Sequence, residues 1–106
     1  MTGALINVPR TARPGEIVEI KTLVSHPMET GFRVGTNGTL IPRDIIGEFQ
    51  CLYNGEEVFR MRLSPAIAAN PFVSFSTVAT ESGTLLFRWT GDKGFTLEQS
   101  ASITVG

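Results

Sequence analysis

The sequence predicts an all-β domain, an antiparallel immunoglobulin-like β-sandwich of seven or eight short strands. Three observations predict it. Apolar residues recur with a period of two rather than 3.6, turn signals built from Gly, Pro and Asn separate the apolar runs, and no long helical pattern occurs. A chain of 106 residues without an internal repeat is expected to form one domain, residues 1–106.

The first part of the chain is expected to supply two strands. Residues 4–8 should form a short strand that Pro9 closes, and residues 10–15 should turn the chain. Residues 16–25 then alternate apolar and polar side chains, which is typical of a strand with one solvated face. Its buried face should carry Val18, Ile20, Thr22 and Val24.

A long irregular connection follows, from Pro27 to Pro42. It contains Asn37-Gly38, a dipeptide that favours tight hairpin turns because both residues tolerate positive φ. We therefore expect a short hairpin that pairs residues 32–34 with residues 39–41.

Asn54-Gly55 is the strongest hairpin signal in the sequence. It should join a strand over residues 45–53 to a strand over residues 57–63. The side chains expected on the inner faces are Phe49, Cys51 and Tyr53 on the first strand and Phe59, Met61 and Leu63 on the second.

The C-terminal part should complete the sandwich. Residues 64–71 are predicted to be a linker, in which residues 66–70 form one helical turn between two prolines. Three more strands are expected at residues 72–80, 84–90 and 95–105. Their inward-facing side chains should include Leu85, Phe87, Trp89, Leu97 and Ile103.

Composition argues against several classes of protein. The formal net charge is −1 and the basic residues are scattered, so no nucleic-acid footprint is expected. No apolar run approaches the ~20 residues that span a bilayer, and residues 1–10 lack the pattern of a signal peptide. One cysteine permits no internal disulfide, and with one histidine it falls short of a structural zinc set. No metal or other cofactor is expected.

The residues do not predict an enzyme. The single histidine, His26, is a general base, a partner contact or, as we favour, a turn histidine bonded to local backbone. Cys51 is expected in mid-strand among apolar residues, which favours an inert buried thiol over a nucleophile. Glu56 and Glu57 are neighbours on a strand and point to opposite faces, so we expect both to be solvated.

Two features leave alternatives open. Arg43-Asp44 is either a local ion pair at a strand start or a contact to a partner. Apolar residues in predicted loops either cover the edges and ends of the sheets or belong to an interface. These residues are Met28, Phe32, Ile67 and Phe72.

Three segments together point to a known family. They are residues 15–31 (GEIVEIKTLVSHPMETG), residues 41–46 (IPRDII) and residues 70–85 (NPFVSFSTVATESGTL), with Tyr53-Asn54-Gly55 and Trp89 in the expected order. In these segments, and over nearly its whole length, the chain resembles the SoxZ family, one subunit type of the SoxYZ carrier complex of bacterial sulfur oxidation.

The resemblance implies a non-catalytic scaffold subunit that pairs with SoxY. In that family the sulfur intermediates of thiosulfate oxidation are carried on a cysteine in a Gly-rich C-terminal arm of SoxY, not of SoxZ. This chain ends in residues 103–106 (ITVG), without a terminal cysteine. The resemblance also implies a periplasmic location, reached by export together with SoxY, and transient contact with other enzymes of the Sox pathway.

We expect the partner surface to involve three parts of the chain, because Met and Phe stand there beside charged residues. The residues expected to contribute are His26, Met28, Glu29, Arg43, Asp44, Phe72 and Phe75. Two other function classes remain. One is a free-standing binding or adhesion module that forms a homodimer through a sheet edge, and the other is an enzyme that uses Cys51 and His26.

Overall fold

The computed structural model of the chain describes residues 3–106, so residues 1 and 2 of the predicted domain lie outside it. Nearly all of its regular structure is β-strand, as predicted. The strands are β1 (Ala4–Asn7), β2 (Thr11–Ala12), β3 (Ile17–Val24), β4 (Ile46–Tyr53), β5 (Glu56–Arg62), β6 (Phe72–Val78), β7 (Gly83–Gly91) and β8 (Thr96–Val105).

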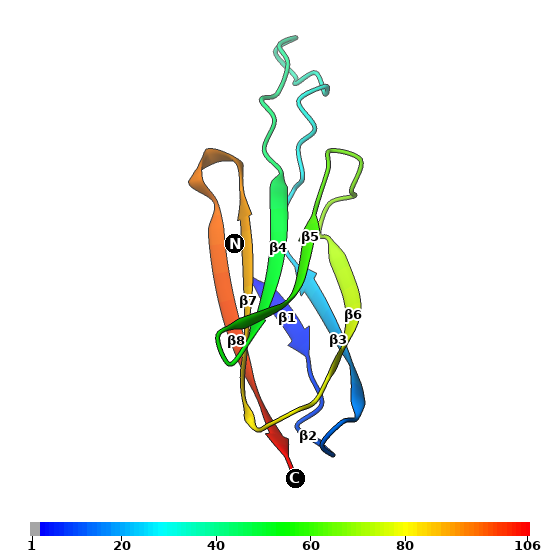
Figure 1. Cartoon of the computed structure of the whole chain (residues 1–106). Coiled ribbons are helices and arrows are strands. Elements are labelled where there is room, and N and C mark those ends of the chain that lie inside the picture. Colours follow the sequence, from blue (N-terminus) through cyan, green and yellow to red (C-terminus); the bar gives the residue numbers. More distant parts are fainter. Residues whose placement is uncertain (1–2) are drawn as a thin grey trace.

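Within residues 3–106 the strands form two sheets that pack face to face (Figure 1). The smaller sheet has the order β1-β3-β6, and the larger has the order β2-β8-β7-β4-β5. Every pairing is antiparallel except that of β2 with β8, which is parallel. The predicted sandwich is therefore confirmed, with one parallel strand pair that the sequence analysis placed in a turn.

That parallel pair exists because the chain changes sheets after β1. The backbone N–H of Thr104 donates to the carbonyl of Arg10, and that of Gly106 donates to Ala12. Thr11 and Ala12 thereby lie alongside the end of β8. A two-residue strand leaves no periodicity to detect, so its pattern could not predict it.

The period-two pattern correctly predicted the core. The predicted inner face of β3 is buried, and so are the predicted inner residues of β4 and β7. Phe49 lies at the centre, with its ring 5.1 Å from Trp89 and 6.0 Å from both Phe59 and Phe75. Trp89 is fully buried, and its Nε1 finds no hydrogen-bond partner among residues 3–106.

The turn predicted at Asn54-Gly55 is confirmed. Asn54 and Gly55 have φ of 49° and 84°, and they join β4 to β5 as expected. The predicted helical turn at residues 66–70 is wrong. Only one turn hydrogen bond forms there, from Ile67 to Ser64, and Asn70 takes a φ of 54°, which interrupts any helix. The short 3-10 helix lies instead at Asp92–Gly94.

Cys51 is buried, as the sequence analysis favoured. It lies in β4 with no exposed surface, and burial raises the pKa of its thiol to about 12. The reactive form of a cysteine is the thiolate, which is scarcely populated at neutral pH when the pKa is this high.

We therefore predict that a thiol reagent labels Cys51 only when the chain unfolds. In native buffer at neutral pH the labelling should be far slower than in denaturant, because both access and thiolate are lacking. Mass spectrometry of the protein after timed exposure measures this. Rapid stoichiometric labelling of the folded chain would contradict the burial of Cys51.

Candidate partner-binding site

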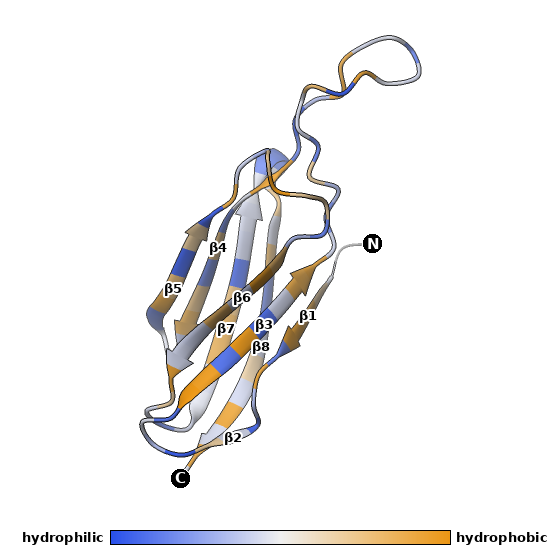
Figure 2. Cartoon of the chain, turned by 90° about the vertical axis from the view of Figure 1, so that its right-hand side faces the viewer, coloured by the Kyte–Doolittle hydropathy of each residue, from blue (hydrophilic) through white to orange (hydrophobic). Residues whose placement is uncertain are grey.

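The most prominent feature outside the sandwich is an arm formed by residues 27–44, between β3 and β4. It leaves one end of the body and projects away from both sheets (Figures 1 and 2). The molecule consequently measures 58 × 21 × 20 Å along its principal axes. The arm is the predicted long connection, and its length separates its outer part from the core.

The outer part of the arm is a short hairpin, as predicted. Val34 and Leu40 form an antiparallel bridge, and the N–H of Ile41 donates to the carbonyl of Arg33. The turn is closed by the N–H of Gly35, which donates to Thr39 at 2.8 Å. The pairing is shorter than predicted, because a single bridge replaces two three-residue strands.

Large apolar side chains on this hairpin are exposed to solvent. Phe32 is 82% exposed, Val34 59% and Leu40 62%. The structure leaves these three side chains with little to pack against in their own chain. Contiguous exposed apolar groups on a small domain are typical of an interaction site.

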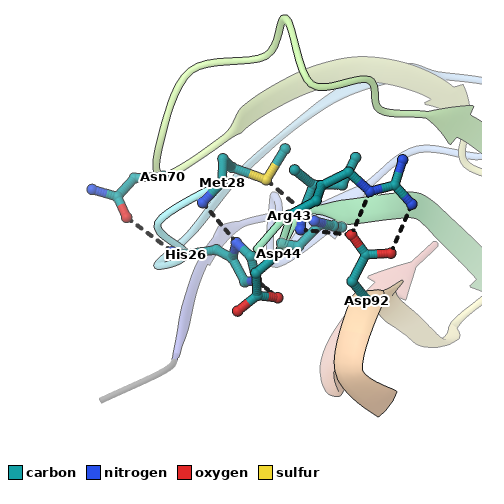
Figure 3. Close-up of polar contacts among 8 residues, drawn as sticks. His26, Met28, Arg43, Asp44, Asn70 and Asp92 are labelled. Atoms are coloured by element: carbon teal, nitrogen blue, oxygen red, sulfur yellow. Dashed lines mark hydrogen bonds and ion pairs between the residues drawn. The ribbon is translucent and has the colours of Figure 1, made fainter. Parts of the chain in front are cut away.

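His26 fastens the first strand of the arm to the body (Figure 3). Its ring is buried, packs edge-on against Phe95 at 4.9 Å, and accepts a hydrogen bond at Nδ1 from the N–H of Met28. The backbone of His26 also exchanges hydrogen bonds with Asn70, at 2.9 Å to Oδ1 and 2.8 Å from the Asn70 N–H. This is the locally bonded turn histidine that we favoured.

The same hydrogen bond fixes which tautomer the neutral imidazole of His26 adopts. Because Nδ1 accepts a hydrogen bond from a backbone N–H, it carries no proton, and Nε2 must carry it in the neutral ring. Nε2 lies 3.7 Å from Oδ1 of Asp44 on the returning strand of the arm. His26 thus contacts both strands of the arm at its base.

Met28 turns the chain into the arm and returns its side chain to the core. It adopts a φ of 52°, a conformation that costs a non-glycine residue of order 1 kcal/mol. Its side chain is only 4% exposed, and its sulfur accepts a hydrogen bond from the N–H of Ile46 at 3.2 Å. Burial of the thioether offsets the strained backbone, so Met28 is an anchor of the arm.

The returning strand is held by Asp92 (Figure 3). Its carboxylate accepts two hydrogen bonds from the Arg43 guanidinium, at 2.9 and 3.0 Å, and a third from the N–H of Ile45. The hydrogen bonds from Arg43 and then from Ile45 lower the pKa of Asp92 below its ordinary value. Arg43 therefore pairs with a residue 49 positions away and not with Asp44.

Two further contacts close the base. The backbones of Glu29 and Asp44 exchange hydrogen bonds of 2.8 Å in each direction, which joins the two strands of the arm. Gly91 allows β7 to approach this point, because a Cβ there would lie 2.3 Å from the carbonyl oxygen of Ile45. Only glycine fits that gap, so position 91 fixes how closely the root of the arm meets the larger sheet.

A charged pair lies just above the base. Arg33 donates from Nε to the Glu29 carboxylate at 3.1 Å, and a second bond from Nη2 completes a bidentate pair. These hydrogen bonds lower the pKa of Glu29 and raise that of Arg33. The pair is solvated, so it orients the first strand of the arm and adds little stability.

The structure divides the predicted interface residues into two groups. His26, Met28 and Phe75 are buried and serve the core in this chain, which leaves them almost no surface to offer. Glu29 and Asp44 are partly exposed at the base of the arm, and Arg43 and Phe72 are exposed. Phe32, Val34 and Leu40 were not among the predicted residues, although Phe32 had been noted as apolar in a loop.

Two properties of the described part of the chain concern metal binding and membrane spanning. Within residues 3–106, no group of three His, Cys, Asp or Glu side chains is placed to hold a metal ion. The same residues include no helix long and apolar enough to cross a membrane.

Comparison with known families gives one match. The family model described as Sulphur oxidation protein SoxZ matches residues 6–102, which is nearly the whole chain. No curated protein matches the sequence.

Several solved structures share the fold. A superoxide reductase (neelaredoxin) from Ignicoccus hospitalis is 17% identical with a TM-score of 0.75, over 97% of this chain and 80% of that one. The sulfur carrier protein SoxY from Chlorobium limicola f thiosulfatophilum is 14% identical with a TM-score of 0.68, over 97% and 78%. A putative superoxide reductase from Thermotoga maritima is 20% identical with a TM-score of 0.70, over 97% and 85%. At these identities the likenesses show the fold alone.

Substitutions in the arm should separate its anchor from its exposed surface. Met28→Ser should lower the free energy of unfolding by about 2–4 kcal/mol, because it removes a buried side chain from a strained turn. Phe32→Ser should change it by no more than about 0.5 kcal/mol, because Phe32 is already in solvent. Urea unfolding of both variants measures the difference, and equal losses would contradict this division.

Asp92→Asn should make the protein less stable and less sensitive to acid. A carboxyl whose pKa is lower in the folded than in the unfolded chain stabilises the fold fully above its unfolded value, and this contribution is lost as the pH falls through the folded value. The ordinary value for Asp92 is 3.8 and the folded value is lower.

The stability difference between wild type and Asp92→Asn should therefore be full well above the ordinary pKa of 3.8 and shrink progressively as the pH falls below it. Urea unfolding at a series of pH values measures it. A difference that stays constant down to the lowest pH would show that the ionised Asp92 carboxylate does not hold the base of the arm.

Proposed function

The chain belongs to the SoxZ family of sulfur-oxidation proteins, and from that premise we propose that it is the non-catalytic scaffold subunit of a SoxYZ sulfur carrier complex. Its partner is SoxY, whose C-terminal cysteine arm carries the sulfur intermediate during thiosulfate oxidation. The observation that carries the proposal is the projecting arm, with three exposed apolar side chains on a firmly anchored base.

The arm is suited to docking because its order does not depend on the partner. Its two strands are fastened to separate parts of the body, the first through His26 and Asn70 and the second through Asp92. A segment that is already ordered loses less conformational entropy on binding than a flexible loop does. Burying a large apolar side chain such as Phe32 contributes about 1.5–3 kcal/mol.

The chemistry of this chain supports a division of labour with its partner. A sulfur carrier needs an accessible cysteine that can form a thiolate, and Cys51 is neither accessible nor readily ionised. This supports the proposal, which rests on family membership, that the carrier cysteine belongs to SoxY and that this chain supplies a rigid base for it. The surface around the arm also serves the pathway enzymes that must reach the carried sulfur.

The proposed location is the periplasm, reached by export together with SoxY. This rests on family membership alone. It is tested by fractionation of cells that carry an intact or a deleted export signal on SoxY. Retention of this chain in the cytoplasm only when that signal is deleted supports joint export.

Arm substitutions test the pairing with SoxY. Phe32→Ser combined with Leu40→Ser should weaken binding to purified SoxY by at least about 10-fold, since two exposed apolar contacts are lost. The matched control is Ile17→Ser, which removes an equally exposed apolar side chain from β3 and should leave the affinity unchanged. Titration calorimetry measures all three proteins.

Two outcomes would count against the proposal. Wild-type chain that does not bind SoxY would remove the scaffold function and favour a free-standing binding module. Binding that the arm substitutions leave unchanged would keep the partner but move the interface away from the arm.

A further inference from the structure

One long side of the sandwich is open, and it is distinct from the arm. It is formed by the edges of β5 and β6, which lie together because Phe59 of β5 stacks on Phe75 of β6, at 4.3 Å and 8°. Among residues 3–106, β6 pairs with β3 and with no other strand, and β5 pairs only with β4. Figure 2 shows β6 beside β3 in the layer that faces the viewer.

The edge of β6 lacks the usual protection against pairing with another strand. Exposed edges are normally blunted by charged residues, by proline or by a bulge. The seven residues of β6, FVSFSTV, contain neither a charge nor a proline, and the pairing with β3 runs without a register shift. The neighbouring edge of β5 carries four charged residues and a bulge in its pairing with β4.

The register identifies the backbone groups on the free edge of β6. The N–H of Val24 donates to the carbonyl of Pro71, so residues 71, 73, 75 and 77 point their backbone groups toward β3. By alternation, the N–H and C=O groups of residues 72, 74, 76 and 78 point away from β3. Their side chains are Phe72, Ser74, Ser76 and Val78, and all four are exposed on the outer face of the sheet.

These four residues are complementary to the same four residues of a second copy of the chain. In an antiparallel pair of two β6 strands about a two-fold axis, Phe72 of one copy stands opposite Val78 of the other, and Ser74 stands opposite Ser76. Each edge-facing residue then meets another edge-facing residue, which is the geometry that antiparallel hydrogen bonding needs. Apolar side chains meet apolar ones, and hydroxyls meet hydroxyls.

The complementarity extends across the whole outer face. Leu5, Leu23 and Phe72 stand in register on β1, β3 and β6, and all three are exposed. The opposite end of the face has Ile17 beside Val78, which are also exposed. The two-fold pairing joins the first row of one copy to the second row of the other, so that one apolar row crosses five strands, β1, β3 and β6 of one copy and β6 and β3 of the other.

The edge of β5 adds charge complementarity on the same side. Its first half carries Glu56 and Glu57, and its second half carries Arg60 and Arg62. An antiparallel arrangement about the same axis brings the acidic half of one copy toward the basic half of the other. Within residues 3–106, neither Glu56 nor Arg62 has an ion-pair partner.

We propose that this open side is a self-association surface, on which two copies of the chain join β6 to β6 in an antiparallel, two-fold symmetric dimer. An interface that uses the same patch on both subunits is the commonest basis of dimers. This assigns Phe72 to a different surface from the arm. The proposal does not depend on the pairing with SoxY, since the arm projects from the end of the sandwich and leaves the edge of β6 open.

Charge substitutions at the two serines test the register directly. Ser74→Lys with Ser76→Lys places like charges opposite each other at two points and should weaken self-association by about 10-fold or more. Ser74→Lys with Ser76→Glu introduces the same lysine, now opposite the new glutamate of the second copy, and should associate at least as strongly as wild type. Both serines are exposed, so neither pair of changes disturbs the core.

Sedimentation velocity of the full chain, from about 10 µM to about 1 mM, measures the dimer. Ser100→Lys with Ser102→Lys is the control, because these exposed residues lie on β8, away from the open side. Wild-type and control proteins should dimerise alike, and the lysine–glutamate variant should dimerise at least as strongly. The double lysine variant at positions 74 and 76 should need a concentration about 10-fold higher or more to reach the same dimer fraction.

Three results would overturn the proposal. Wild-type chain that stays monomeric at the highest concentration leaves the surface without a second copy. A dimer that the two lysines at positions 74 and 76 do not weaken uses another face. If the wild-type chain never self-associates and the double lysine variant no longer binds SoxY, the β6 edge is a surface for SoxY and not for a second copy.

Discussion

The position of the arm depends on one buried side chain, His26. A loop of this length would ordinarily sample many conformations, because its outer residues make few contacts with the body. The imidazole prevents this at the base, where Nδ1 accepts the N–H of Met28 and Nε2 lies beside Asp44. Met28 can then hold its positive φ and keep its side chain in the core. The rest of the candidate site follows from where these two residues place the first strand of the arm.

The chain separates its rigid parts from its exposed apolar parts. Aromatic side chains around Phe49 fill the sandwich, while the hairpin of the arm and the outer face of the smaller sheet keep large apolar groups in solvent. Such exposure costs free energy that a partner recovers on binding. The two surfaces differ in kind. The arm offers side chains on a narrow projection, and the open side offers a strand edge with unpaired backbone groups.

Much of the fold could be predicted because period two directly records which face of a strand is buried. The strands with clean alternation, such as β3, were placed to within a residue or two. The parallel strand β2 was missed because two residues carry no period. The chain turn at Asn70 was misassigned because positive φ at a non-glycine residue is decided by tertiary hydrogen bonds, here with His26.

The site was predicted less well for a related reason. The sequence places Met28 and Phe32 in the same loop, and nothing local shows that one returns to the core while the other faces solvent. That difference arises from the Met28 backbone turn and from two contacts with distant residues. Ile46 donates to the sulfur of Met28, and Asp44 pairs with the backbone of Glu29. The partner of Arg43 was unpredictable in the same way, because Asp92 reaches it only through the packing of β7 against β4.

Amide hydrogen exchange of the chain, alone and with SoxY, tests the central claim most directly. The account predicts that amides of residues 28–30 and 44–46 are slow in both states, because the base is preformed. Amides of residues 32–41 should become markedly slower when SoxY is added, because the hairpin is then covered. No change in the hairpin at saturating SoxY would contradict the claim that the arm is the docking element. Fast exchange at the base in the free chain would contradict the claim that His26 and Asp92 hold it in place.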